Sequence, residues 1–417
     1  MTDTSARPAR VGRATVASLF LLGQFAFPAV AGADTSEEPP TLPQVHEFKG
    51  EQQPCGPEST DTVDQLPWTH SSLGLDEAHR LSTGAGVTIA VLAPELDATG
   101  PALEDAVDQG ETADCLGYGT FVAGIVGGRS FEGNGAVGVA PEATLRFVPT
   151  GSPATGVATA GEIASGVATA ADSGASVILV ATSAWSGSTE LDQAVEAATE
   201  DGSLVVAPAT VNTSRGPVPG HPAQHTSVLA VAGHTPEGPP SIESPLPLPD
   251  GTPSRVDLLA PGDRAVAPGV GGGHVTGSGA GVAAAFVAGT AALLTERFPD
   301  LGTEELRDRL LATAYPSPGG DDDPVHGSGR VDPVGALLSH PAEESVTVAG
   351  DVFVPDPSPQ GTLEALPTSL VAGGFALLIV VCGLGAAVVR NGRARSWRPT
   401  AQGEPVPIGP PPDPLRD

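Results

Sequence analysis

The pattern of apolar and polar positions alternates between short apolar runs and helical patterns from residue 86 to about 340. Six apolar runs have the length of strands and lie at 87–92, 144–148, 177–180, 204–207, 228–231 and 256–259. Helical patterns follow or separate them at 121–126, 162–171, 191–198, 277–294 and 303–314. Continuous apolar strands separated by helices are typical of a parallel sheet covered on both faces. The pattern therefore predicts a three-layer α/β domain.

The stretch 277–294 reads GSGAGVAAAFVAGTAALL and is small or apolar on every side, with no charge. A helix of this kind must be enclosed on all faces, so it is predicted to be the central core helix of the domain. Gly279 and Gly281 precede its apolar run and predict a tight turn into the helix N-terminus, where unpaired backbone N–H groups gather. Turns of this kind often present a nucleophile, but the position here is a glycine.

The N-terminal residues 1–33 have the three parts of a secretory signal peptide. Arginines precede an apolar run over 19–29, and small residues suited to an A-x-A cleavage site follow at 29–33. The alternative is a retained anchor, which is disfavoured because the run is short and is broken by Gln24 and Pro28. Export is predicted, and the polar, proline-rich segment 34–85 is predicted to be an extension wrapping a domain that starts near residue 86.

The C-terminal part begins with an acidic, proline-rich stretch at 341–369, which is typical of a solvated linker. Residues 370–389 then carry no charge, and these 20 residues can cross about 30 Å of hydrocarbon. Four arginines follow between 390 and 398, so the positive-inside rule places the tail 390–417 in the cytoplasm and the domain outside. The sequence predicts a single-pass protein of the cell membrane.

The net charge of the chain and the spacing of its potential metal ligands exclude some classes of binding partner. The chain has 49 acidic and 19 basic residues and a net charge of −30, which argues against nucleic-acid binding through phosphate contacts. The histidines are scattered without the spacing of metal ligands, and the run Asp321–Asp323 lacks a liganding pattern. No metal and no cofactor are therefore expected.

The three cysteines are Cys55 in the extension, Cys115 in the domain and Cys382 in the C-terminal apolar run. In an exported protein the first two can pair, and the chain-entropy model gives such a bridge about 4 kcal/mol. The alternative is two free buried thiols, which an oxidising compartment disfavours.

Three motifs together carry a resemblance to a known family. They are VLAPELD at 91–97, DCLGYGTFVAGI at 114–125 and SGAGVAAAFVAG at 278–289. Over 66–340 the chain resembles the subtilisin-like serine proteases and, among them, the mycosins associated with type VII secretion. The resemblance implies the subtilisin-like fold, and the cysteine pair is similar to a mycosin bridge between the extension and the second motif.

The resemblance also implies where catalytic residues should stand. Ala93 occupies the position of the aspartate, Tyr118 that of the histidine and Gly281 that of the serine nucleophile. A serine protease needs an oxygen nucleophile, a base near neutral pH and a carboxylate that orients the base. A phenol with a pKa near about 10 is a donor at neutral pH and not a base. No functional catalytic residue is therefore expected.

Supporting positions of the family also differ. The oxyanion-hole asparagine falls at Thr210, although Asn212 is close enough for the alignment to slip, and the substrate-binding edge lies at 177–183. A rebuilt catalytic site would have to use residues near the motifs, but each has an ordinary structural role in the family pattern. These residues are Glu95, Asp97, Asp114, His274 and Ser278.

The sequence thus predicts a membrane-anchored, extracytoplasmic, mycosin-like pseudoprotease. The resemblance implies a scaffold or binding role in the membrane complex of type VII secretion. Two alternatives stay open: an active endopeptidase that uses displaced residues, and a module that binds exported peptides in the old cleft along 177–183.

Overall fold

A computed structural model describes residues 41–108, 113–213, 215–242, 245–320, 323–339 and 368–395, with no side chains for 368–376. The predicted signal peptide 1–33, nearly all of the predicted linker and the tail beyond 395 lie outside the described residues. The chain divides into two units, 1–341 and 342–417, which are considered separately.

The first unit is built on a sheet whose described strands follow the order β12-β13-β9-β8-β5-β4-β1-β3-β2. All neighbouring strands in it pair in parallel except β12 and β13. The mainly parallel sheet predicted from the apolar runs is confirmed. Its strands are β1 Thr88–Ala93, β2 Val107–Asp108, β3 Thr144–Pro149, β4 Val177–Val180, β5 Leu204–Pro208, β8 Leu229–His234, β9 Leu258–Pro261, β12 Tyr315–Pro316 and β13 Gly329–Arg330.

Alternate residues of each central strand enter two separate cores. On β1, Ile89 and Val91 belong to one core, whereas Ala90 and Leu92 belong to the other. Because successive side chains of a strand point to opposite faces, a strand buried on both sides must be apolar throughout. This is why the apolar runs were continuous and not alternating.

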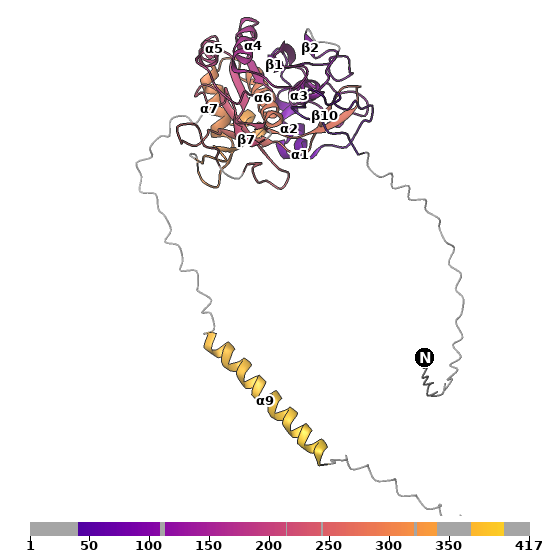
Figure 1. Cartoon of the computed structure of the whole chain (residues 1–417), viewed down its shortest axis with the longest axis vertical. Helices are drawn as coiled ribbons and strands as arrows, with labels where there is room; N and C mark the ends of the chain where they lie inside the picture. Colours follow the sequence, from indigo (N-terminus) through magenta and orange to yellow (C-terminus); the bar gives the residue numbers. More distant parts are fainter. Residues whose placement is uncertain are drawn as a thin grey trace, which may run out of the picture. The chain divides into compact units, whose positions relative to one another are not determined.

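Helices cover both faces of the sheet and complete the three predicted layers (Figure 1). On one face α4 (Ala160–Asp172) and α5 (Thr189–Glu200) pack together against the central strands. On the other face α3 (Tyr118–Gly127) packs against α6 (Ala280–Arg297). The shorter helices are α1 Trp68–Leu73, α2 Leu75–Leu81, α7 Thr303–Ala312 and α8 Pro333–Leu338.

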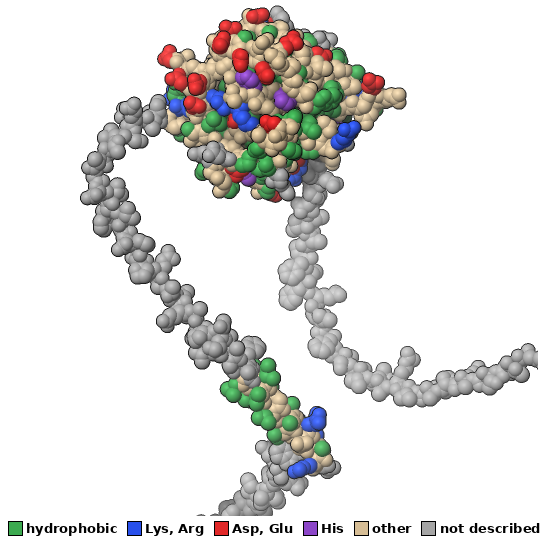
Figure 2. Space-filling model, turned by 60° about the vertical axis from the view of Figure 1, so that its left-hand side comes forward, with side chains coloured by type: hydrophobic (Ala, Val, Ile, Leu, Met, Phe, Trp, Pro, Cys, Tyr) green, Lys and Arg blue, Asp and Glu red, His purple; other side chains and the backbone are tan. Residues whose placement is uncertain are grey.

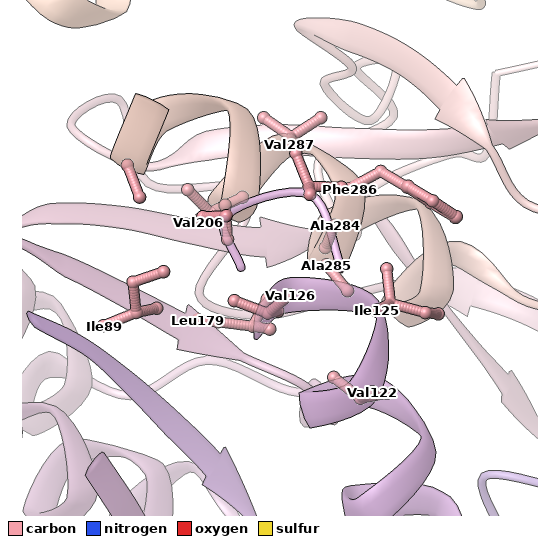
Figure 3. Close-up of a cluster of buried hydrophobic side chains, with 14 of the residues drawn as sticks. Ile89, Val122, Ile125, Val126, Leu179, Val206, Ala284, Ala285, Phe286 and Val287 are labelled. Carbon is pink, nitrogen blue, oxygen red and sulfur yellow. The ribbon is translucent and has the colours of Figure 1, made fainter. Parts of the chain in front are cut away.

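Helix α6 is the central helix that the sequence predicted. Every residue from Gly281 to Leu294 is buried, and the helix contacts β4, β5, β8 and β9. Figure 3 shows side chains of α6, among them Phe286, beside residues of α3 and the sheet. The predicted turn is also present, because Gly279 precedes the helix with a φ of 143°, which other residues rarely adopt.

The short irregular strands and the first helix were missed by the sequence analysis. Two small antiparallel ribbons lie outside the main sheet, and their strands are β6 Thr210–Thr213, β7 Gly216–Pro219, β10 Ala265–Pro268 and β11 His274–Gly277. All four segments are only four residues long, and β7, β10 and β11 contain proline or glycine, so their composition indicates turns. Tertiary pairing, and not local pattern, makes them strands.

The extension is part of the domain. Val45, Leu75 and Ala78 belong to the larger core, and the backbone of Val45 donates to the Thr276 carbonyl at 2.8 Å. The predicted disulfide is confirmed between Cys55 and Cys115, with 4.7 Å between the Cα atoms. The extension is therefore packed into the domain and is not a detached tail.

The second unit contains α9, which runs from Thr368 to Ala394. Its segment Leu377–Ala394 has a mean hydropathy of 1.5 and is long and apolar enough to cross a membrane. Figure 2 shows hydrophobic side chains along this helix and arginines near one end. The helix extends past the predicted bounds of 370–389, because Arg390 and Arg393 continue it at its C-terminal end, where the helix dipole favours cations.

Candidate functional site

The strand order places a crevice at the carboxyl ends of β1 and β4. The chain passes from β1 to β3 on one side and then to β4 on the other side of β1. In open α/β sheets, ligands bind at such a reversal of strand order. Ala93 is the last residue of β1, and Ala181 follows β4, so both lie at this edge.

The start of α3 brings Tyr118 to the same edge. Gly117 precedes the helix with a φ of 72°, and the buried carboxylate of Asp114 accepts N–H bonds from Gly117 and Thr120 at 2.8 and 2.9 Å. Burial raises the pKa of Asp114, and these bonds oppose that rise. Asp114 therefore fixes the helix start and is not a free catalytic carboxylate.

The phenol of Tyr118 fills the space beside Gly281. Tyr118 is 2% exposed, and its hydroxyl donates to the Ala181 carbonyl at 3.4 Å. A Cβ atom added to Gly281 would lie 2.2 Å from the Tyr118 hydroxyl oxygen and 2.4 Å from the Ala181 carbonyl oxygen. Separations below 3.0 Å are essentially never adopted by real Cβ atoms. The structure therefore has no room for a side chain at residue 281, the predicted nucleophile position, unless these groups shift.

The surroundings of the Tyr118 phenol keep it neutral. Burial, and secondarily the negative charge of Glu47, raise the pKa of the phenol well above its ordinary value. A phenol of this kind donates a hydrogen bond and does not accept a proton at neutral pH.

Ala93 lies next to the first turn of α3, which carries Tyr118, and is fully buried. An added Cβ on Gly119 would be 3.0 Å from the Ala93 Cβ atom, so the methyl group packs against the first turn of α3. The structure thus brings together the three positions that the sequence singled out, Ala93, Tyr118 and Gly281.

The other candidate catalytic groups are engaged elsewhere. The Ser278 hydroxyl donates to Asp263 at 3.0 Å and accepts from the Arg264 N–H group at 2.9 Å. The His274 ring accepts from the Val63 N–H group at 2.8 Å. Among the hydrogen bonds of the described residues, no serine hydroxyl is paired with a histidine ring, so no displaced serine–histidine pair is formed.

The two carboxylates after β1 are also occupied. Glu95 accepts the Cys115 N–H group at 2.7 Å, and Asp97 accepts the hydroxyl and N–H group of Thr99 at 2.7 and 2.8 Å. Both hold turns near the edge of the sheet. Neither orients a base.

The two candidates for the oxyanion position face different cavities. Thr210 lines a small pocket with Ala232 and Val256. Asn212 instead lines a cleft with Ser183 and Ser278. The polar group on the cleft side is therefore Asn212, the neighbour to which the alignment could slip.

The cleft has a volume of about 540 Å³ and lies between Ser183, at the end of the predicted substrate-binding edge, and the extension. Trp185 in its wall is 59% exposed. The extension contributes His46, Glu47, Phe48 and Lys49. The sequence analysis did not place these four residues at the site, because their position depends on backbone pairing far along the chain and not on a local motif.

Glu47 is the unusual group of this wall. Its Oε1 atom is enclosed and has no hydrogen-bond partner among the described residues. Burial raises the pKa of the carboxyl from 4.5 to about 8. An ionised carboxylate without a partner is costly to bury, so the group is mainly protonated at neutral pH.

The raised pKa of the Glu47 carboxyl predicts that the stability of the folded domain depends on pH. Because its pKa is higher in the folded protein, the folded state binds the proton more tightly, and stability falls as pH rises from about 4.5 through about 8. We expect the unfolding temperature of Glu47→Gln to fall less between pH 5 and pH 9 than that of the unmodified chain. Thermal unfolding followed by circular dichroism measures this. Identical pH profiles would contradict it.

The next feature is the arrangement of the side chains that commonly bind metal ions. Within the described ranges, no group of three or more His, Cys, Asp or Glu side chains is placed to hold a metal ion. Asp321 and Asp322 lie outside the described residues, and the Asp323 carboxylate accepts from Ser317 at 3.1 Å and from the Val325 N–H group at 2.9 Å.

Comparisons with known proteins agree with the fold. Residues 84–336 match the model of the subtilase family, Peptidase_S8. Mycosin-1 of Mycobacterium tuberculosis is 33% identical over 331 residues, which cover 65% of this chain and 73% of that protein. Mycosin-3 of the same organism is 32% identical over 78% of this chain and 84% of its own length. The crystal structure of MycP1 from Mycobacterium smegmatis is 26% identical, with a TM-score of 0.57, over 74% of this chain and 94% of that chain.

Proposed function

The chain belongs to the subtilase family, and from this premise we propose that it is a non-catalytic, mycosin-like component of a type VII secretion system, anchored in the membrane by α9. One observation carries the proposal: the Tyr118 phenol and the Ala181 carbonyl occupy the space that a side chain at residue 281 would need. The old active site is filled by the protein itself.

The chemistry of the filled site supports a binding role. Subtilase catalysis requires a nucleophile, a base and an orienting carboxylate. Ala93 has no titratable group, and Gly281 has no side chain. The raised pKa of Tyr118 keeps its phenol protonated at neutral pH, so no phenolate is available to act as a base. A replacement triad would need a serine–histidine contact, and Ser278 and His274 make other bonds.

The place of action follows from the relatives and from the second unit. A similar solved structure is that of a serine protease, MycP1, an essential component of the type VII (ESX-1) secretion system, and it is 26% identical to this chain. Helix α9 would hold the subtilase domain outside the cell, with the predicted tail 390–417 inside. The fold is thus retained to bind other components of the machinery while the catalytic groups are lost.

One experiment on native membranes tests both parts of the proposal. We expect the tagged full chain, solubilised in mild detergent, to co-purify with other secretion components and to remain unlabelled by a fluorophosphonate probe. Ser278→Ala is the matched control and should leave both results unchanged, because its hydroxyl bonds Asp263 and not a base. Labelling that a single substitution abolishes would contradict the loss of catalysis, and purification of the chain alone would contradict its place in the complex.

A second candidate function is capture of exported peptides in the old cleft. The observation that favours it is the open space of about 540 Å³ next to the former substrate edge, with Trp185 exposed in its wall. Exposed aromatic side chains in a concave surface are typical of peptide-binding sites. Capture by the cleft is compatible with a filled catalytic centre, because the cleft lies beside that centre.

A further inference from the structure

The wall of the cleft that comes from the extension is held firmly in place. The Thr276 N–H group donates to the Pro43 carbonyl at 2.8 Å, and the Lys49 N–H group donates to the Thr155 carbonyl at 3.1 Å. The disulfide at Cys55 follows shortly afterwards in the chain. Glu47 lies between these attachments, so its backbone is held in place where the residue lines the cleft.

The carboxyl of Glu47 lacks a countercharge in the described structure. Lys49 is the nearest cation along the chain, but its Nζ atom donates to the Gln53 carbonyl at 3.1 Å. The other titratable groups at this position are exposed His46 on the extension and the neutral phenol of Tyr118 on α3. An enclosed oxygen without a partner is uncommon in folded proteins and requires an explanation.

The rest of the cleft suits the stem of a long basic side chain. Trp185, 59% exposed, and Phe48 offer aromatic surface, and Val157 and Val211 add apolar surface. Lysine and arginine bury their methylene groups along apolar surface and place their charges against aromatic rings or carboxylates. The cleft thus combines an apolar, aromatic wall with one unpaired acid.

We propose that this cleft binds an extended peptide segment through a lysine or arginine side chain, whose cation pairs with the Glu47 carboxylate and lies against Trp185. The inference rests on the proposed peptide-capturing function and specifies its ligand. The excess of acidic over basic residues, 49 to 19, favours the approach of such a cationic segment.

Proton release is a consequence of this pairing. In the empty cleft the carboxyl is mainly protonated at pH 7, because its pKa is about 8. A bound cation stabilises the ionised form and lowers that pKa, so binding releases part of a proton near neutral pH. The affinity for the cation should therefore rise between pH 6 and pH 8.

The test uses the full chain in detergent micelles and two peptides that differ in one charge. We expect acetyl-Ala-Ala-Lys-Ala-Ala-amide to bind at least about tenfold more tightly than the same peptide with glutamine, as measured by isothermal titration calorimetry. Glu47→Gln should remove this preference and Trp185→Ala should weaken binding of both peptides. Glu200→Gln, an exposed acid near the end of α5, is the matched control and should change nothing.

Each outcome decides the inference. Equal affinity for the two peptides, or a lysine preference that survives in Glu47→Gln, would overturn it. If Glu47→Gln does not fold, titrations of the unmodified chain in buffers of different ionisation enthalpy replace it, and absence of proton release at pH 7 overturns the pairing. Mass spectrometry of the peptides after incubation separates the two proposals, because cleavage would contradict the non-catalytic function without affecting the role of Glu47.

Discussion

Gly281→Ser is expected to destabilise the domain by about 3 kcal/mol and to yield no peptidase activity. The added Cβ atom meets the Tyr118 hydroxyl oxygen at 2.2 Å and the Ala181 carbonyl oxygen at 2.4 Å. The Ala181 oxygen belongs to the backbone at the end of the sheet, and the Tyr118 hydroxyl belongs to a buried ring. Moving either group away from the added atom therefore costs free energy of folding. Urea unfolding of the chain and of Gly281→Ser measures the difference.

A matched glycine separates crowding from the effect of adding a side chain to a helix. Gly161 in α4 is also helical, but the nearest atom to an added Cβ is a flexible carboxylate oxygen at 3.9 Å. Gly161→Ala should therefore leave stability unchanged or raise it by up to about 1 kcal/mol. Destabilisation of both variants by the same amount would contradict the steric explanation.

Tyr118→Phe tests whether the hydroxyl oxygen of Tyr118 causes the crowding at residue 281. Without the hydroxyl, the nearest ring atom would be 3.5 Å from the added Cβ, which is ordinary contact, while the Ala181 oxygen would still lie at 2.4 Å. The combination of Tyr118→Phe with Gly281→Ala should recover about 1 kcal/mol relative to the sum of the single changes. Strict additivity would show that the phenol does not crowd residue 281.

This crowding changes the meaning of the three substitutions. The sequence alone predicts that Ala93, Tyr118 and Gly281 are three separate departures from the family pattern, each in its own motif. In the structure, Tyr118 and Gly281 form one packed unit, because the larger side chain occupies space that the smaller residue leaves. A serine at residue 281 would therefore require removal of the phenol and a shift of the Ala181 carbonyl.

Local pattern sufficed for the parts of the fold that are buried on two sides. The strands β1, β4 and β5 are uniformly apolar, and α6 has no polar face, so periodicity and burial agree for them. The disulfide was also predictable, since an exported chain with two cysteines outside its apolar C-terminal run has a single pairing for them. These features depend on residue type alone.

The chemistry of the cleft could not be predicted in the same way. Glu47 lies in a polar, proline-rich segment whose local sequence indicates only an extension. Its place at the site is set by the hydrogen bond between Val45 and Thr276 and by the disulfide between Cys55 and Cys115. Thr276 and Cys115 are both distant from Glu47 in the chain. The steric exclusion at Gly281 likewise depends on distances across three elements, and a motif reports only residue identity.

Removal of the disulfide is expected to cost about 4 kcal/mol of unfolding free energy in the chain-entropy model, because the bridge closes a loop with a sequence separation of 60. This value is the upper limit, reached when the extension unfolds together with the core that contains Val45 and Leu75. Urea unfolding of Cys55→Ser/Cys115→Ser against the unmodified chain measures it. Cys382→Ser, which changes a free, exposed cysteine of α9, is the matched control and should leave the domain transition in place.

The same variant links stability to the cleft. Without the bridge, the segment that carries Glu47 is held by the backbone hydrogen bonds of Pro43, Val45 and Lys49 and by the packing of Val45 alone. Local opening of this segment then costs less than global unfolding. We therefore expect the double variant to lose the preference for lysine peptides at urea concentrations where the core remains folded. If unfolding shifts by about 4 kcal/mol but the preference is retained until the core melts, the hydrogen bonds alone position Glu47 and the bridge acts only on the unfolded chain.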